Sequence, residues 1–216
     1  MKINYNLCAR YIPTILNIIP VIVFINLVVD VDLIEIPVNN FIKFLGMNLS
    51  MGGILIYFFS LLFRILSKTL IENKLFKNQA LFPTTKFLLN NNKISPEFKN
   101  NILEKIKNDF KLDLKNSNDT KIIIDAIGLI RKRVGDGHLV LRRNIEYGFM
   151  RNLIVGAPLT LIFCSIIIIN KNETGYSILF GIYGGFALIL FLCCKTILNY
   201  LAEQYAKQLF YEYLDT

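Results

Sequence analysis

Long apolar runs divide the chain into two pairs, and a charged stretch separates the pairs. The runs cover residues 12–29, 41–66, 152–169 and 176–198. As a helix the first run would measure about 27 Å, close to the hydrocarbon thickness of a bilayer. Only KNETG at 171–175 separates the last two runs, so we expect an antiparallel hairpin there. The pattern predicts an all-α membrane protein with four transmembrane helices, two on each side of a helical insert.

The stretch between the pairs has the period of amphipathic helices. Ser95-Pro96-Glu97 is typical of a helix start, with a hydroxyl N-cap, a proline in the first turn and an acid near the positive end of the dipole. Apolar residues then recur every four positions, at Phe98, Ile102, Ile106 and Phe110. NSND at 116–119 can cap a second helix, with one apolar side made of Ile123, Ile127 and Ile130, and Gly135-Asp136-Gly137 would end it. From His138 we expect one continuous helix through Arg151 into the third span.

These elements predict four parts. They are an N-terminal transmembrane hairpin at 1–66, a basic helical domain at 67–151, a second transmembrane hairpin at 152–198, and a C-terminal helix at 199–216 that continues the fourth span. One face of this last helix carries Leu198, Leu201, Tyr205, Leu209 and Tyr213. That face can dock on the insert of its own chain or on that of a neighbouring subunit.

Composition and charge support a membrane protein and give its orientation. The 216 residues are 54% hydrophobic and carry a net charge of +8. The connection after the first span is acidic, with Asp30, Asp32 and Glu35, whereas residues 67–151 hold seventeen Lys/Arg against nine Asp/Glu. Positive segments stay on the cytoplasmic side. We therefore expect the insert and both termini on the cytoplasmic side of the membrane. In a pore, an outer ring of the three acids would favour cations.

The residues that usually carry catalysis or bind metals do not form a recognisable set. The four cysteines (Cys8, Cys164, Cys193 and Cys194) lack metal or disulfide spacing, and His138 is the only histidine. Neither a phosphate-binding glycine loop nor a zinc motif occurs. We expect a protein that is not an enzyme and has no cofactor and no metal.

Polar residues within the first two predicted spans include Asn17, Asn26, Asn48, Ser50 and Ser60. Such groups either form hydrogen bonds between helices or line a water-filled path. Pro13 and Pro20 would loosen the first span, and the carbonyls they free need partners.

Small residues in the fourth span recur every four positions, at Ser177, Gly181 and Gly185. Such a stripe lets two helices approach closely in lipid. The partner helix can belong to the same chain or to a second copy of it.

Basic residues gather just before the third span. Arg142 and Glu146 are four apart on a helix and can pair. On a separate face, Arg143, Tyr147 and Arg151 would keep two unpaired guanidinium groups beside an aromatic ring, which suits a phosphate and a nucleobase. The run Arg131-Lys132-Arg133 could lie nearby after the glycine turn. The alternative is an ordinary positive border that touches anionic lipid headgroups.

Two segments resemble a known family. LFPTTKFLLNNNKISPEFKNNILEKI at 81–106, with Pro83-Thr84-Thr85, and RRNIEYGFMRNLIVG at 142–156 resemble the transmembrane effectors of Hailong-type bacterial anti-phage defence. The order of elements is similar over most of the chain. The resemblance implies a homo-oligomeric ion channel, a tetramer, paired with a nucleotidyltransferase. That enzyme makes oligodeoxyadenylate, a single-stranded ligand rather than duplex nucleic acid, which holds the channel shut until infection depletes it.

The sequence therefore predicts an antiviral ion channel gated by an oligonucleotide on its cytoplasmic insert, and depolarising the membrane when released. Two other functions stay open. One is a non-conducting membrane anchor that recruits a cytosolic partner such as the nucleotidyltransferase. The other is a membrane enzyme, for which a cluster of polar groups near the interface would be required.

Overall fold

The computed structural model describes residues 4–28, 49–77, 79–89, 94–114, 119–135, 137–170 and 174–216, without the side chains of 26–28, 49–52 and 138. Helices form nearly all of this part of the chain, and it contains no strand. Four of its helical segments are long and apolar enough to cross a membrane. The protein is thus an all-α, multi-pass membrane protein, as its hydrophobic pattern predicts.

Several predicted functional positions fall outside this description. Asp30, Asp32, Glu35 and Asn48 lie outside the described residues, as do the side chains of Asn26 and Ser50. The outer acidic ring and these three span positions stay predictions.

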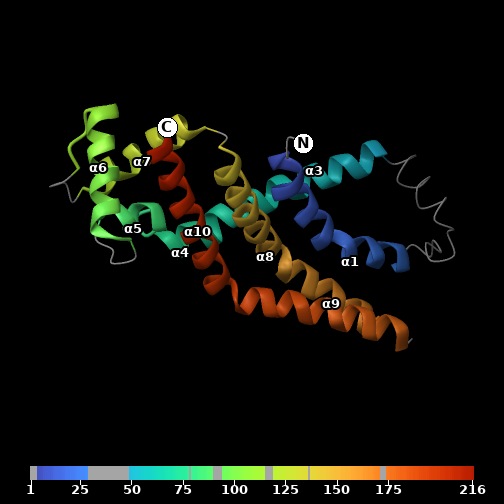
Figure 1. Ribbon diagram of the computed structural model, residues 1–216. Helices are drawn as coiled ribbons and strands as arrows, with labels where there is room; N and C mark the ends of the chain where they lie inside the picture. The colour runs from blue at the N-terminus through green and yellow to red at the C-terminus, as the bar shows by residue number, and fades with distance from the viewer. Residues whose placement is uncertain are drawn as a thin grey trace. The chain divides into compact units, whose positions relative to one another are not determined.

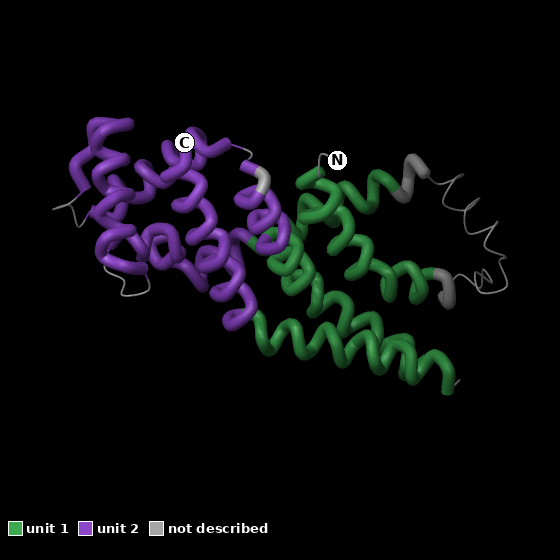
Figure 2. The backbone as a smooth tube through the Cα atoms, in the orientation of Figure 1, with its two compact units in different colours: residues 1–67, 148–194 green, residues 68–147, 195–216 purple. Residues whose placement is uncertain are grey.

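The chain forms two compact units (Figure 2). Unit 1 combines residues 1–67 with 148–194, and unit 2 combines 68–147 with 195–216. Both the insert and the C-terminal segment therefore contribute to unit 2.

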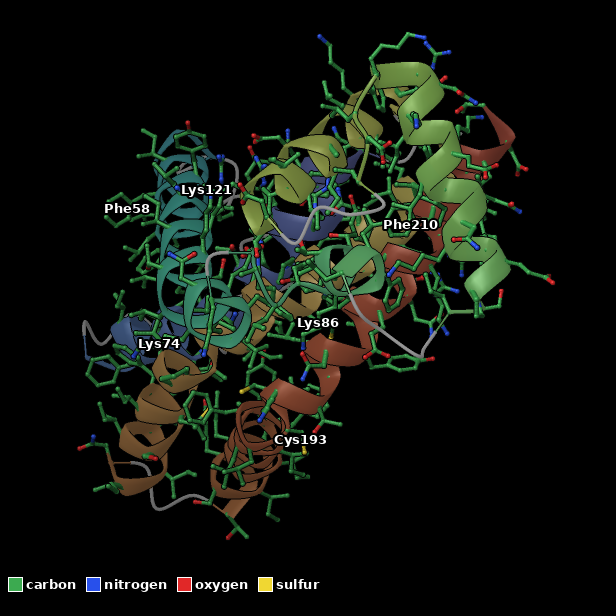
Figure 3. The ribbon with its side chains drawn as sticks, turned by 90° about the vertical axis from the view of Figure 1, so that its left-hand side faces the viewer. Phe58, Lys74, Lys86, Lys121, Cys193 and Phe210 are labelled. Carbon is green, nitrogen blue, oxygen red and sulfur yellow. The ribbon has the colours of Figure 1, made fainter. Side chains whose placement is uncertain are left out.

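Unit 1 holds most of each candidate membrane span. It contains the π-helix η1 (Leu7–Tyr11), α1 (Ile12–Val28), α3 (Leu49–Leu66), most of α8 (His138–Asn170) and α9 (Thr174–Leu192). In Figure 1, α9 runs beside the end of α8. Cys164, Ile167 and Phe180 form a buried core between these two helices. The outer faces remain apolar: Phe58 is 55% exposed and points away from α3 in Figure 3, as expected of a lipid-facing side chain.

Two predicted span ends differ from the ends of the helices. The second apolar run was expected to end at residue 66, but helix continues through η2 (Ser67–Glu72) and α4 (Asn73–Phe76), so the candidate span covers Gly53–Phe76. The fourth was expected to reach residue 198, but α9 ends at Leu192, and α10 (Cys194–Asp215) starts after a turn at Cys193. Hydropathy misses this break because the residues on both sides of it are apolar.

Unit 2 is built on the predicted amphipathic helices. It contains α5 (Pro83–Leu89), α6 (Pro96–Phe110), α7 (Thr120–Val134), the start of α8, and α10. Ser95 caps α6 by accepting a hydrogen bond from the Phe98 amide (3.2 Å), and Asp119 caps α7 through the Lys121 amide (2.8 Å). Gly135, at φ 61°, ends α7. The predicted apolar faces of both helices are inward: Ile102, Ile106, Ile123, Ile127 and Ile130 are buried.

The C-terminal helix α10 docks on the insert of its own chain. The Tyr213 hydroxyl donates to Asp109 of α6 (3.1 Å), and the ring of Tyr211 lies 4.8 Å from that of Phe98. Glu212 accepts hydrogen bonds from the first amides of α8, at Leu139 (3.1 Å) and Val140 (2.9 Å). The pKa of Tyr213 is raised, mainly by burial and to a smaller extent by the hydrogen bond to Asp109. The apolar face of α10 is thus used within one chain.

Candidate functional site

A cluster of buried polar side chains joins the helices of unit 1, and we call Asn17, Ser67, Asn152 and Thr160 the amide cluster. Asn17 of α1 is 3% exposed. Its Nδ2 donates to the carbonyls of Asn152 (3.3 Å) and Leu153 (3.2 Å) in α8, and its Oδ1 accepts from Thr160 (3.0 Å). Of the two interpretations left open by the sequence, hydrogen bonding between helices is the one that the structure shows for Asn17.

Two side chains satisfy the carbonyls that prolines leave without a helical donor. Pro13 has no N–H to offer to Ala9 four residues earlier, and the carbonyl of Ala9 accepts instead from Asn152 Nδ2 (2.7 Å). Pro20 likewise deprives Leu16, whose carbonyl accepts from the Tyr183 hydroxyl of α9. The sequence indicated that such partners are needed.

The remaining amide oxygen of Asn152 also has a partner. The Ser67 hydroxyl donates to Asn152 Oδ1 (3.1 Å). The Asn152 side chain therefore forms hydrogen bonds to both η1 and η2. Asn152 is only 2% exposed. The amide cluster is therefore a satisfied hydrogen-bond network, which orients α1 against α8.

Close backbone approach in unit 1 depends on Gly156. A Cβ built at Gly156 would lie 2.1 Å from Asn17 Nδ2, so only glycine leaves room for the amide. By contrast, a Cβ at Gly181 or Gly185 would meet nothing within 4 Å, and the neighbouring Gly184 is the one that faces Cys164. The small-residue stripe predicted from Ser177, Gly181 and Gly185 thus leaves both its glycines unused inside the chain.

The basic stretch at the start of α8 differs from the expectation. Arg142 pairs with Glu146 as predicted (3.2 Å), but Arg143, expected to be unpaired, also contacts Glu146 (2.8 Å). The reason is that positions three and four residues before an acid both lie within reach on a helix. One carboxylate therefore neutralises part of both charges.

Tyr147 cannot offer the aromatic face that the sequence suggested. Its side chain is 5% exposed, and its ring meets that of Phe82 edge to face at 5.8 Å and 88°. Arg151, the last member of the predicted stripe, is half-buried and belongs to unit 1, whereas Arg143 and Tyr147 belong to unit 2. The expectation of an open arginine–tyrosine–arginine face is wrong for Arg143 and Tyr147.

Arg131 has a different environment from the two cations that follow it. Lys132 and Arg133 are exposed, whereas Arg131 is half-buried, with its Cζ 5.9 Å from the ring centre of Phe82 and 5.8 Å from that of Tyr205. Arg131 Nε is buried and has no hydrogen-bond partner among the described residues. The guanidinium is thus held on two aromatic rings while one of its donors is unused.

A cavity of about 170 Å³ opens beside this guanidinium. We call it the Arg131 cavity; its lining comes from α7, the start of α8, and α10, namely Arg131, Gly135, Val140, Leu141, Asn144, Tyr205 and Leu209. Within the described part of the chain, Arg131 is the only charged residue of this lining. Of the residues predicted to bind a ligand, Arg131 lines this cavity.

Sequence reasoning missed Asn144, Tyr205 and Phe82 around Arg131. Asn144 belongs to the segment RRNIEYGFMRNLIVG, but nothing in that segment indicates that the Asn144 side chain lines a cavity. Tyr205 lies more than seventy positions after Arg131 in the chain, so the contact depends on the docking of α10. The other quoted motif is structural: Pro83, Thr84 and Thr85 are buried, and the Thr85 hydroxyl donates to the Gln79 carbonyl (2.9 Å).

Comparison of the chain with protein-family models, with curated proteins and with solved structures found no match.

Proposed function

We propose that the protein is a homo-oligomeric ion channel of the bacterial inner membrane, an effector of antiviral defence held closed by an oligonucleotide signal. The insert and both termini lie in the cytoplasm in this proposal. Release of the signal opens the channel and depolarises the membrane.

The observation that carries this proposal is the continuity of α8. Its 33 residues run without interruption from the basic part of unit 2 into a candidate membrane span. A ligand that binds near the start of α8 therefore acts on the same helix that continues into a candidate membrane span. The resemblance to Hailong-type effectors supports an oligonucleotide as this ligand, and the glycines of α9 left unused within the chain suit contact with a second copy.

Energetics set a condition on such a ligand. To move an equilibrium from 1:99 to 99:1, it must bind the closed state more tightly by roughly 5.5 kcal/mol. Contacts between arginines and phosphates that exist only in the closed assembly can supply this difference. Because such contacts release counterions, binding should weaken as salt rises.

Reconstitution of the purified protein in liposomes tests the proposal. We expect ion flux from the protein alone and loss of that flux when a short oligodeoxyadenylate is added to the side of the insert. An oligothymidylate of equal length and empty liposomes are the controls. If liposomes that contain the oligomeric protein stay impermeable to ions, the protein does not conduct.

One observation favours a second function, a non-conducting anchor that recruits a partner such as a nucleotidyltransferase. The members of the amide cluster bond to one another and to backbone carbonyls, so these polar groups do not need a water-filled path. An anchor predicts sealed liposomes together with co-purification of the partner. A channel predicts flux when no partner is present.

A further inference from the structure

We propose that the Arg131 cavity is a binding site for one phosphate group of a ligand. The inference begins with the buried Nε of Arg131, which has no hydrogen-bond partner among the described residues. A buried donor left without an acceptor is unfavourable, and an arginine donor more so than a neutral one. The same side chain lines the cavity, through which an anion can approach the guanidinium.

The side chains around the cavity select an anion. Among the described residues, the lining provides one guanidinium and the amide of Asn144, and no carboxylate. Two acids of α8 and α10 have partners outside the lining: Glu146 pairs with Arg142 and Arg143, and Glu212 accepts from the amides of Leu139 and Val140. An incoming anion therefore meets positive charge from the described part of the lining.

The two aromatic rings fix the orientation of the guanidinium before the ligand arrives. Phe82 and Tyr205 each lie within 6 Å of its carbon. A planar guanidinium binds phosphate oxygens in a fork, and holding it in place reduces the entropy lost on binding. This geometry favours a phosphate over a compact spherical anion such as chloride.

The size of the cavity indicates how much of the ligand it encloses. A cavity of about 170 Å³ is several times the roughly 10–15 Å³ that one water needs in the same measure, so it holds a phosphate group with waters. Sites that enclose a whole drug-sized ligand measure roughly 300–1,000 Å³. One phosphate group therefore enters, while the rest of the ligand stays outside.

The source of the phosphate is where this inference rests on the proposed function, which supplies it from an oligonucleotide. A lipid headgroup or free phosphate carries the same chemistry. Three probes distinguish these sources: a short oligodeoxyadenylate with a 5′ phosphate, glycerol 3-phosphate as a headgroup mimic, and inorganic phosphate.

Titration calorimetry on the purified full-length protein in detergent tests the site with these probes. We expect Arg131→Gln to weaken the tightest-binding probe at least tenfold, because the charge and the oriented fork are lost. Arg131→Gln also removes contacts with two rings, so Asn144→Leu is a second variant, expected to weaken binding several-fold with unchanged thermal unfolding. Lys121→Gln is the matched control, since it removes an exposed charge from the same helix without touching the cavity, and it should change affinity less than twofold.

The outcomes separate this site from the proposed function. Binding of any of the three probes that depends on Arg131 and Asn144 supports the site, and the tightest probe names the source. The site is overturned if no probe binds the unaltered protein, or if Asn144→Leu and a folded Arg131→Gln both bind as the unaltered protein does. Arg131-dependent binding with sealed liposomes overturns the channel alone, whereas oligonucleotide-sensitive flux that is unaffected by both variants overturns the cavity alone.

Discussion

The amide cluster of unit 1 and the Arg131 cavity of unit 2 treat buried polar groups in opposite ways. In the amide cluster, Asn17 and Asn152 use their donors and acceptors on partners from the same chain. In the cavity, Arg131 keeps a buried donor that no described residue satisfies. A satisfied network orients helices, whereas an unsatisfied charged donor on a side chain that lines a cavity indicates a candidate ligand-binding site. Polar side chains inside a predicted span are therefore weak support for a pore until their hydrogen-bond partners are known.

We expect the largest loss of stability from Asn17→Leu in the amide cluster. The substitution removes three hydrogen bonds and leaves two carbonyls and a hydroxyl without this partner in an apolar setting. We expect a loss of roughly 2–4 kcal/mol in the free energy of unfolding. Denaturant titration in mixed micelles measures it.

Ser165→Ala is the control for Asn17→Leu. Ser165 is exposed, and its hydroxyl donates only to Leu161 of its own helix, so we expect a change within about 0.5 kcal/mol. Equal effects of the two substitutions would mean that the amide cluster does not hold α1 on α8.

Two glycine substitutions test the close approach between helices in unit 1. Gly156→Ala would place a methyl group 2.1 Å from Asn17 Nδ2, and we expect it to cost about 1–3 kcal/mol. Gly181→Ala meets open space and should be neutral or stabilise the helix by up to about 1 kcal/mol. The same titration applies, and native mass spectrometry of Gly181→Ala reports whether that face contacts a second copy. A Gly156→Ala variant as stable as the unaltered protein contradicts the close approach.

In unit 2, Glu212 provides a smaller test, because it caps α8 from a distant part of the chain. Glu212→Ala removes the acceptor for the amides of Leu139 and Val140, and we expect a loss of about 1 kcal/mol. Glu212→Gln keeps an acceptor oxygen and should lose less. Hydrogen exchange at these two amides checks the mechanism directly. Unchanged protection in Glu212→Ala would count against the cap.

The smallest effect concerns the pH dependence of unit 2. Burial and the hydrogen bond to Asp109 raise the pKa of Tyr213 in the folded protein, whereas an unfolded tyrosine has a pKa of about 10. The folded form therefore binds a proton that the unfolded form loses above that pH. The contribution is present below pH ~10 and decreases as pH rises from there toward the folded pKa.

Tyr213→Phe isolates this contribution, because it keeps the ring and removes the titrating hydroxyl. Thermal unfolding followed from neutral pH to about pH 11 should show a steeper loss of stability in the unaltered protein than in Tyr213→Phe. Parallel curves would mean that Tyr213 does not remain protonated in the folded state.

The sequence predicted most helices, because their signals are local. Ser95 and Asp119 act as caps, and Ile102, Ile106 and Ile123 are buried on the expected faces. The end of α9 at Leu192 was missed, since apolar residues continue past the turn and carry no mark of it. Periodicity describes a helix face well and a break inside an apolar run poorly.

Candidate site residues were harder to predict, because their surroundings come from tertiary contacts. Helical spacing placed Arg143 and Tyr147 on one face, but spacing alone could not show that Glu146 reaches Arg143 or that Phe82 covers Tyr147. Arg131 was named for its charge alone. Its rings and its cavity depend on the docking of α10, which no local pattern reports.

The two proline-freed carbonyls of the first helix also constrain the order of biogenesis. Ala9 waits for Asn152, which is 143 residues later, and Leu16 waits for Tyr183, 167 residues later. During synthesis the first helix therefore reaches the translocon long before the side chains that complete it exist. We expect it to stay at the translocon or the bilayer interface until α8 and α9 have been made.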